Sequence, residues 1–168
     1  LFEPGLDPLI QEGLEKGTLE FSGWSEELLS NTRCLWVTHD TPVNEKDEAD
    51  VDFVLSKVKK AMDHLPSAAM ILLSSQLPVG STEQLKQYGS QYFPEKTFHF
   101  IVIPENLRLG KAIDVFLNPD RYVIGVDDEK IQERLKDVFQ PITDQLVWMS
   151  TASAEMTKHA INSFLAVS

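Results

Sequence analysis

The sequence contains only one cysteine, Cys34, among its 168 residues. A single thiol forms no internal disulfide, so a disulfide-stapled scaffold is excluded. Cysteine usage of this kind is typical of a reducing compartment, and we therefore expect a cytoplasmic protein. Because Cys34 lies within the apolar run CLWVTH, we expect it to be a small buried core residue rather than a nucleophile.

Long apolar runs and positive charge are also scarce. No apolar run approaches the roughly 18 residues that cross a bilayer, so we expect no membrane partner. Acidic residues number 26 against 15 basic ones, which gives a formal net charge of −11. A field of this sign repels nucleic acid and anionic membranes, and nucleic acid is therefore not an expected partner. The four histidines show no metal-ligand spacing with each other or with the cysteine, so we assign no metal.

The sequence also lacks the Gly-x-Gly-x-x-Gly motif that usually marks a dinucleotide site. Its first residue is not methionine, and its last apolar helical pattern has neither a glycine cap nor a basic final turn. We interpret these features as those of an interior piece of a longer protein. With 42% apolar residues, the chain is still long enough for one ordinary domain with a hydrophobic core.

Strand and helix patterns alternate along the chain. Apolar runs predict strands at TLEFS, RCLWVTH, AMILLSS, FHFIVIP, RYVIGV and QLVWMS. Helical spacing predicts helices between them, among others at 8–15, 51–65, 130–139 and 154–167. The unbroken apolar run RCLWVTH predicts a strand that is covered on both faces. Strands separated by helical crossovers predict an α/β fold with a mostly parallel sheet and flanking helices.

Three loops that follow these strands carry most of the unusual chemistry: DTPV, SQLPVG and PENLRLG. Ligands of open α/β sheets lie outside the carboxyl ends of the strands, which is where these loops begin. Their proline and glycine residues fix backbone conformations that are suited to presenting amide groups. We therefore expect a small-molecule crevice at this edge of the sheet.

Lys158 and Asn162 are four residues apart and therefore share one face of the predicted last helix. Apolar residues pack around the rest of that helix and leave it little polar surface, which predicts that it is buried or lies in a subunit interface; they are Met156, Ala160, Ile161, Phe164 and Leu165. In either place the two polar side chains need partners. On spacing alone, a surface lysine beside a packing asparagine is the commoner arrangement.

The loop after FHFIVIP begins with Glu105. A carboxylate at the ligand edge is a candidate general base. A glutamate in the first turn of a helix, favoured by the helix dipole, is the commoner explanation of this position. Arg108 and Lys111 follow in the same loop, where they are candidates to hold phosphate oxygens or are simply solvated helix residues.

Five segments in a fixed order carry a resemblance to a known family: EPGL, DTPV, SSQLPVGSTE, PENLRLGKAIDVFLNPDRYVIG and SAEMTKHAINSFLA. Together they resemble the UDP-glucose/GDP-mannose dehydrogenase family from one end of the chain to the other. The resemblance implies a Rossmann-like domain that binds NAD, followed by a long central helix that builds a homodimer. It also implies a nucleotide-sugar substrate whose C6 alcohol is oxidised twice, to a carboxylate.

The resemblance implies roles for individual residues. Lys158 and Asn162 correspond to the pair that stabilises oxyanionic species at C6. Glu105 corresponds to a glutamate that takes part in proton transfer and thioester hydrolysis. The backbone that lies along the nucleotide sugar corresponds to Asn106, Leu107, Arg108 and Leu109. The implied cofactor contacts are Thr41, Pro42, Ser75 and Gln76.

The same resemblance divides the chain into the latter part of the NAD-binding domain, residues 1–150, and the start of the central helix, residues 151–168. The glycine fingerprint is expected before Leu1, and the catalytic cysteine with its aspartate after Ser168. Cys34 is not that cysteine, because its position matches a strand of the NAD-binding domain. Without a thiolate no thiohemiacetal forms, so we expect this piece to be inactive alone.

Three departures from the family pattern leave the substrate open: Gln76 stands where many members have Thr, Asn106 where they have Phe, and Leu109 where they have Glu. We expect oxidation of UDP-glucose to UDP-glucuronate, a step in polysaccharide biosynthesis. The alternatives in the same class are GDP-mannose and UDP-N-acetylhexosamine. A non-catalytic nucleotide-sugar-binding protein is the alternative from a different class.

Overall fold

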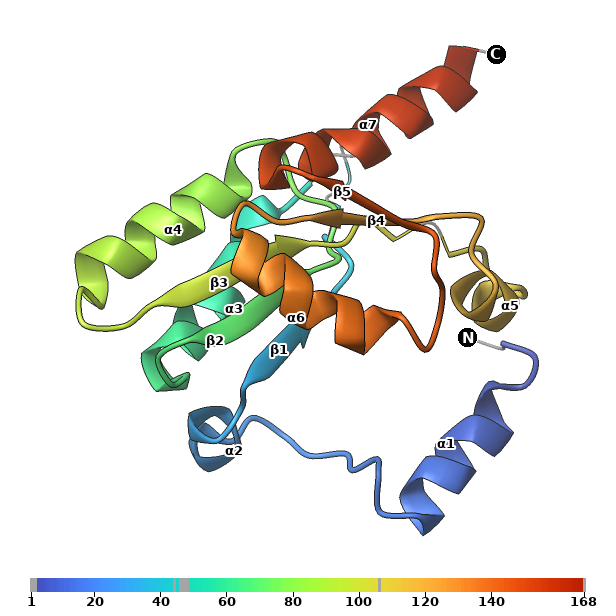
Figure 1. Cartoon of the computed structure of the whole chain (residues 1–168), viewed down its shortest axis with the longest axis horizontal. Coiled ribbons are helices and arrows are strands. Elements are labelled where there is room, and N and C mark those ends of the chain that lie inside the picture. The colour runs from blue at the N-terminus through green and yellow to red at the C-terminus, as the bar shows by residue number, and fades with distance from the viewer. Residues whose placement is uncertain (1–2, 44, 46–48, 106, 168) are drawn as a thin grey trace.

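The computed structural model describes residues 3–43, 45, 49–105 and 107–167, without the side chains of residues 162, 165 and 166. Among these residues, one five-stranded sheet organises the fold, and its strands lie side by side in sequence order (Figure 1). The strands are β1 (Cys34–Val37), β2 (Ala69–Leu73), β3 (Phe98–Val102), β4 (Tyr122–Gly125) and β5 (Leu146–Met149). Neighbouring strands run parallel except for β3 and β4, which are antiparallel. The predicted Rossmann-like, mostly parallel α/β fold is therefore confirmed.

Seven helices connect and cover the strands in the described part of the chain: α1 (Leu6–Glu15), α2 (Glu26–Ser30), α3 (Val51–His64), α4 (Ser81–Tyr92), α5 (Ala112–Leu117), α6 (Glu129–Phe139) and α7 (Thr151–Val167). Figure 1 shows α6 in front of the sheet and α3 behind it. Among the residues that the structure covers, no helix is long and apolar enough to cross a bilayer.

Two hydrophobic cores lie on opposite faces of the sheet. In β2, Ile71 and Leu73 point into the core beneath α3 and α4, whereas Leu72 points into the core beneath α6. All five residues of this strand are buried, because side chains alternate between two covered faces. The continuous apolar run that predicted the strand is the direct result of this double burial.

The prediction of a strand at residues 18–22 is wrong. The N–H groups of Thr18 and Leu19 donate to the carbonyl oxygen of Gly13, at 2.9 and 3.0 Å. Gly17 adopts a positive φ of 65°, a conformation common just after a helix. These amides therefore close the end of α1, and an extended segment without strand pairing leads to α2.

The prediction that the strand of Cys34 is covered on both faces is also wrong. β1 pairs with β2 and lies at the edge of the described sheet. Cys34 is exposed, and Trp36 keeps 38% of its surface exposed. Desolvation nevertheless raises the pKa of the Cys34 thiol, which disfavours the reactive thiolate. Cys34 is thus neither a core residue nor an activated nucleophile.

The last helix, α7, begins against the sheet and then extends beyond it (Figure 1). Ala154 and Glu155 are buried in its first turns, but Phe164 keeps 69% of its surface exposed. The prediction that this helix is buried is therefore wrong for its second half within this chain. The alternative prediction, a subunit interface, is left as a prediction.

Candidate functional site

A cavity of about 910 Å³ lies at the carboxyl ends of the first three strands. The loops that follow β1, β2 and β3 line it, and α7 contributes Lys158 and His159. This is the edge of the sheet at which the sequence predicts a ligand. Because β4 is antiparallel to β3, its amino end faces the same cavity, which Tyr122 and the preceding residue Arg121 line.

Glu105 and Lys158 meet in this cavity. The ammonium group of Lys158 forms an ion pair with Oε1 of Glu105, 53 positions earlier in the chain. Oε2 of Glu105 accepts a hydrogen bond of 2.8 Å from the N–H of Leu107. The Lys158 side chain is 20% exposed and that of Glu105 is 37% exposed. The pair therefore joins the loop after β3 to α7 in a partly desolvated place, where charge interactions are stronger than in water.

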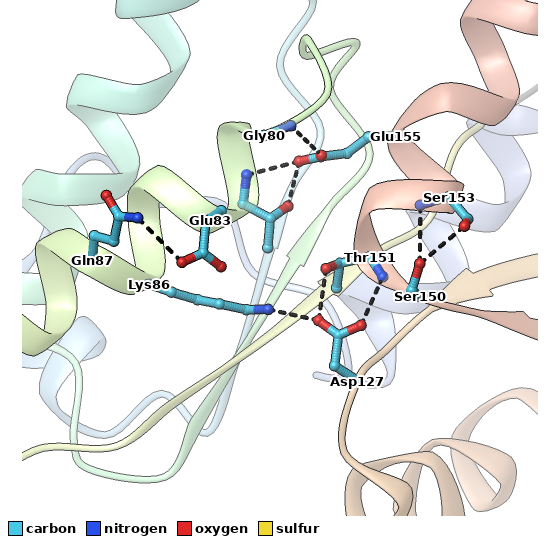
Figure 2. Close-up of polar contacts among 10 residues, drawn as sticks. Gly80, Glu83, Lys86, Gln87, Asp127, Ser150, Thr151, Ser153 and Glu155 are labelled. Carbon is cyan, nitrogen blue, oxygen red and sulfur yellow. Dashed lines mark hydrogen bonds and ion pairs between the residues drawn. The ribbon is translucent and has the colours of Figure 1, made fainter.

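The N-terminus of α7 is fixed by Asp127, which follows β4 (Figure 2). Its carboxylate accepts from the N–H of Thr151 at 3.0 Å, from the Thr151 hydroxyl at 2.7 Å and from Lys86 of α4 at 2.6 Å. Desolvation raises the pKa of Asp127, but the hydrogen bonds from Lys86 and Thr151 outweigh it, so the pKa is lower than usual. These bonds place the helix that carries Lys158.

A second carboxylate, Glu155, joins α7 to the start of α4 (Figure 2). Its oxygens accept from the N–H of Gly80 at 2.7 Å, and from the N–H and hydroxyl of Thr82 at 2.7 and 2.6 Å. Glu155 is only 7% exposed. The N–H groups at the start of a helix have no partner within the helix, and those of Gly80 and Thr82 donate to Glu155 instead. These bonds and the dipole of α4 stabilise the negative charge of Glu155. Glu155 lies three residues before Lys158 and therefore on a neighbouring part of the same helix face.

The first turn of α7 packs directly on β4. A Cβ atom placed on Gly125 would lie 2.4 Å from Cβ of Ala154 and 3.1 Å from the carbonyl oxygen of Ser150. Only glycine permits so close an approach at this position. Sequence reasoning found neither this contact nor Glu155. The one signal for Glu155 was an acidic residue in a segment that also supplies apolar packing.

The predicted cofactor residues lie in two loops that are bonded to each other. The Thr41 hydroxyl donates to the carbonyl oxygen of Gln76 at 2.7 Å, and the Ser75 hydroxyl donates to that of His39 at 2.6 Å. Thr41, Ser75 and Gln76 line the cavity. Pro42 is not among the lining residues; its carbonyl oxygen accepts from the N–H of Asp50 at 2.7 Å.

His159 joins α7 to the second of these loops. Its Nε2 atom lies 3.0 Å from the carbonyl oxygen of Leu77. Because a carbonyl oxygen only accepts, Nε2 carries the proton in this contact. Together with Glu155, this bond fixes the loop of Ser75 and Gln76 relative to Lys158.

The predicted substrate residues are placed less uniformly. Leu107 lines the cavity, whereas Arg108 and Leu109 are exposed and do not. Asn106 lies outside the described residues. Asn162 belongs to α7, but its side chain is outside the described part of the structure. Of the predicted catalytic residues, the structure therefore brings together Glu105 and Lys158.

Comparisons with known proteins find relatives over almost the whole of this chain. UDP-glucose 6-dehydrogenase of Rickettsia bellii is 34% identical over 171 residues, which cover 99% of this chain and 38% of the relative. The corresponding protein of Bacillus subtilis is 29% identical over 167 residues and is covered to the same extent. The chain thus spans about 38% of the length of these curated relatives.

Solved structures show the same fold. A UDP-glucose dehydrogenase from Pyrobaculum islandicum is similar with a TM-score of 0.86 and 29% identity, over 99% of this chain and 39% of that one. A GDP-mannose dehydrogenase from Pseudomonas aeruginosa gives a TM-score of 0.89 at 20% identity, over 99% of this chain and 40% of that one. The family model described as "UDP-glucose/GDP-mannose dehydrogenase family, NAD binding domain" matches residues 1–143, which makes NAD the cofactor of this domain. The chain belongs to the UDP-glucose/GDP-mannose dehydrogenase family.

Proposed function

We propose that this chain is the latter part of the NAD-binding domain, residues 1–150, and the start of the central helix, residues 151–168, of a nucleotide-sugar 6-dehydrogenase. UDP-glucose is the expected substrate and UDP-glucuronate the product. The observation that carries the proposal is the ion pair of Glu105 and Lys158 inside a cavity at the carboxyl edge of the sheet. Family membership and the names of the curated relatives support it.

The residues of the cavity fit part of an NAD molecule. Hydroxyl and backbone groups of Thr41, Ser75 and Gln76 lie at the ends of two parallel strands, where nucleotides bind in open α/β sheets. The N-terminus of α4 is occupied by the Glu155 carboxylate, so its amides are not available to the pyrophosphate. This part of the chain therefore suits the side of the cofactor away from its phosphates.

When bound, NAD would supply the hydride acceptor that each of the two proposed oxidations at C6 requires. Glu105 takes the hydroxyl proton when the alcohol is oxidised, because its carboxylate faces the same cavity as Lys158. Lys158 stabilises the negative charge that develops on the oxygen of C6. Asn162 shares this role in the proposal, and the backbone of residues 106–109 lies along the sugar nucleotide.

The second oxidation needs a thiolate that holds the aldehyde. Cys34 does not supply it, since it lies on the outer strand β1 and its thiol pKa is raised. We therefore propose that the chain alone does not complete turnover. In the full-length protein, the exposed apolar half of α7 takes part in a homodimer, and the protein acts in the cytoplasm in polysaccharide biosynthesis.

The test uses the full-length protein with NAD and a panel of UDP-glucose, GDP-mannose and UDP-N-acetylhexosamines, followed by NADH absorbance. The expected result is turnover of UDP-glucose with about two NADH per sugar, because the alcohol loses four electrons in total. Turnover of GDP-mannose alone would overturn the substrate assignment. Binding of nucleotide sugars without any NADH would identify a non-catalytic binding protein and refute the proposed reaction.

A further inference from the structure

The segment EPGL forms a tight turn at the start of α1. The carbonyl oxygen of Glu3 accepts from the N–H of Leu6 at 3.2 Å, and Gly5 has φ 85° and ψ −3°. These are the features of a type II turn, which favours proline at its second position and needs glycine or asparagine at its third. Pro4 and Gly5 occupy those positions. The motif therefore encodes a rigid turn, which fixes the direction of the Glu3 side chain.

The carboxylate of Glu3 binds a segment more than a hundred residues away in sequence. Oε2 accepts from the N–H of Gly110 at 2.6 Å, and Oε1 accepts from the N–H of Ala112 at 2.7 Å. Gly110 has a positive φ of 82°, and the turn around it is closed by a 2.9 Å bond from the N–H of Lys111 to the carbonyl oxygen of Arg108. Both oxygens of Glu3 are thus used to hold the end of the loop that joins β3 to α5.

We propose that Glu3 is a positioning residue for the substrate loop, defined as residues 105–111. This inference rests on the proposed function, in which the backbone of this loop lies along the nucleotide sugar. The loop begins at Glu105, which is held by Lys158, and ends at the two amides held by Glu3. Leu107 lies between these fixed points and lines the cavity.

A carboxylate suits this task better than a neutral side chain. Two neighbouring N–H groups need two acceptors, and charge-assisted bonds to a carboxylate are roughly twice as strong as neutral ones. Glutamine offers one acceptor oxygen, and its NH₂ group opposes the second amide. Removal of Glu3 therefore frees the turn at Gly110 while the Glu105–Lys158 pair and the cofactor loops keep their own bonds.

The first arm of the test measures amide hydrogen exchange by mass spectrometry in the full-length protein, with Glu3→Ala and Glu3→Gln. Peptides that cover residues 107–113 should exchange about tenfold faster in Glu3→Ala and less so in Glu3→Gln. Peptides of β2 should exchange as in the wild type. The exposed Glu20 provides the matched control, Glu20→Gln, which should leave both regions unchanged. Unchanged exchange at residues 107–113 in Glu3→Ala would overturn the inference.

A further variant guards against misfolding of Glu3→Ala. Gly5→Ala keeps the carboxylate but strains the turn at its positive φ, while the added Cβ meets only Cδ1 of Ile113 at 3.7 Å. It should loosen residues 107–113 in the same pattern and to a smaller extent. Loss of protection throughout the domain in both variants would show a general structural role and would also overturn the inference.

The second arm measures kinetics. The KM for the nucleotide sugar should rise about tenfold in Glu3→Ala, while kcat and the KM for NAD change less than twofold, because the hydrogen bonds described for the Glu3 carboxylate come from Gly110 and Ala112 of the substrate loop and its end. Equal changes in both KM values would contradict a role confined to the substrate loop. If the wild type shows no dehydrogenase activity, the proposed function fails. The role of Glu3 is then tested by hydrogen exchange at residues 107–113 and by the Kd for UDP-glucose, measured by calorimetry. Faster exchange and a higher Kd in Glu3→Ala would support that role, and no change in either would overturn it.

Discussion

Replacing Glu155 by glutamine tests how α7 is attached to the domain. Glu155 is 7% exposed, and its two oxygens accept three hydrogen bonds from Gly80 and Thr82 (Figure 2). Glutamine has nearly the same shape, but only one of its two terminal atoms accepts hydrogen bonds. Whichever way the amide is oriented, its NH₂ group faces an N–H group at the start of α4.

The expected loss of stability follows from this geometry. At least one buried backbone N–H loses its acceptor, which costs about 1–3 kcal/mol. Loss of the negative charge at a helix N-terminus costs a further 0.3–1 kcal/mol or so. Since a neutral side chain no longer carries the desolvation cost of a buried charge, part of this is offset. We expect Glu155→Gln to lower the free energy of unfolding by about 2 kcal/mol.

Urea denaturation and thermal unfolding both measure this loss. For a domain of this size, about 2 kcal/mol lowers Tm by roughly 4–8 °C. Glu83→Gln is the matched control. Glu83 lies beside Thr82 in the first turn of α4 but is exposed, and the hydrogen bond described for its side chain is a 3.2 Å bond from Gln87 (Figure 2). This substitution should change stability by less than about 1 kcal/mol, the range for an exposed charge in the first turn of a helix. An equally small change for Glu155→Gln would refute the reasoning that its buried hydrogen bonds attach α7.

Three further predictions concern the fold and the site. Gly125→Ala should lower the free energy of unfolding by about 1–3 kcal/mol, because the added Cβ collides with the first turn of α7. Gly23→Ala is the control: no atom lies within 4 Å of its added Cβ, so the free energy of unfolding should not fall. Thermal unfolding measures both variants. Desolvation lowers the pKa of His99 in the folded state, so the unfolded chain takes up its proton first. Stability should therefore fall as the pH drops below about 6.5, and His99→Gln should flatten that dependence in urea titrations. Lys158→Ala in the full-length protein should lower kcat about a hundredfold or more in the NADH assay; an unchanged kcat would exclude Lys158 from oxyanion stabilisation.

The alternation of strands and helices was predictable where both sheet faces are covered. β2 consists entirely of buried apolar residues, and its sequence AMILL has the pattern of a doubly covered strand. The sequence RCLWVTH has the same pattern, yet β1 lies at the edge of the described sheet with Cys34 exposed. An apolar pattern indicates that a strand forms, but the order of strands in the sheet decides how far it is covered. Strand order depends on contacts between distant segments, which no local pattern contains.

The same distinction applies to the candidate site. Loops at the carboxyl ends of strands were predictable because proline, glycine and polar residues follow apolar runs. The meeting of Glu105 with Lys158 was expected from the family resemblance, since spacing alone favoured a surface lysine. Glu3 and Glu155 left almost no local signal, because all but one of the hydrogen bonds described for them come from backbone amides, 107 and 109 residues away for Glu3 and 75 and 73 for Glu155; the exception is the Thr82 hydroxyl. Any residue except proline presents the same N–H group, so the partner's identity carries no information.

Under the proposed function, these backbone contacts explain how an acidic chain presents a cavity to an anionic nucleotide sugar. Four carboxylates at or near the site each accept at least one backbone N–H: Glu3, Glu105, Asp127 and Glu155. Their charge is thereby stabilised by loop and helix amides and, for Glu105, by Lys158. If these bonds are lost, the repulsion of the substrate phosphates increases together with the mobility of the loops. The carboxylates that hold the loops in place therefore also set the electrostatic field at the site proposed for the nucleotide sugar.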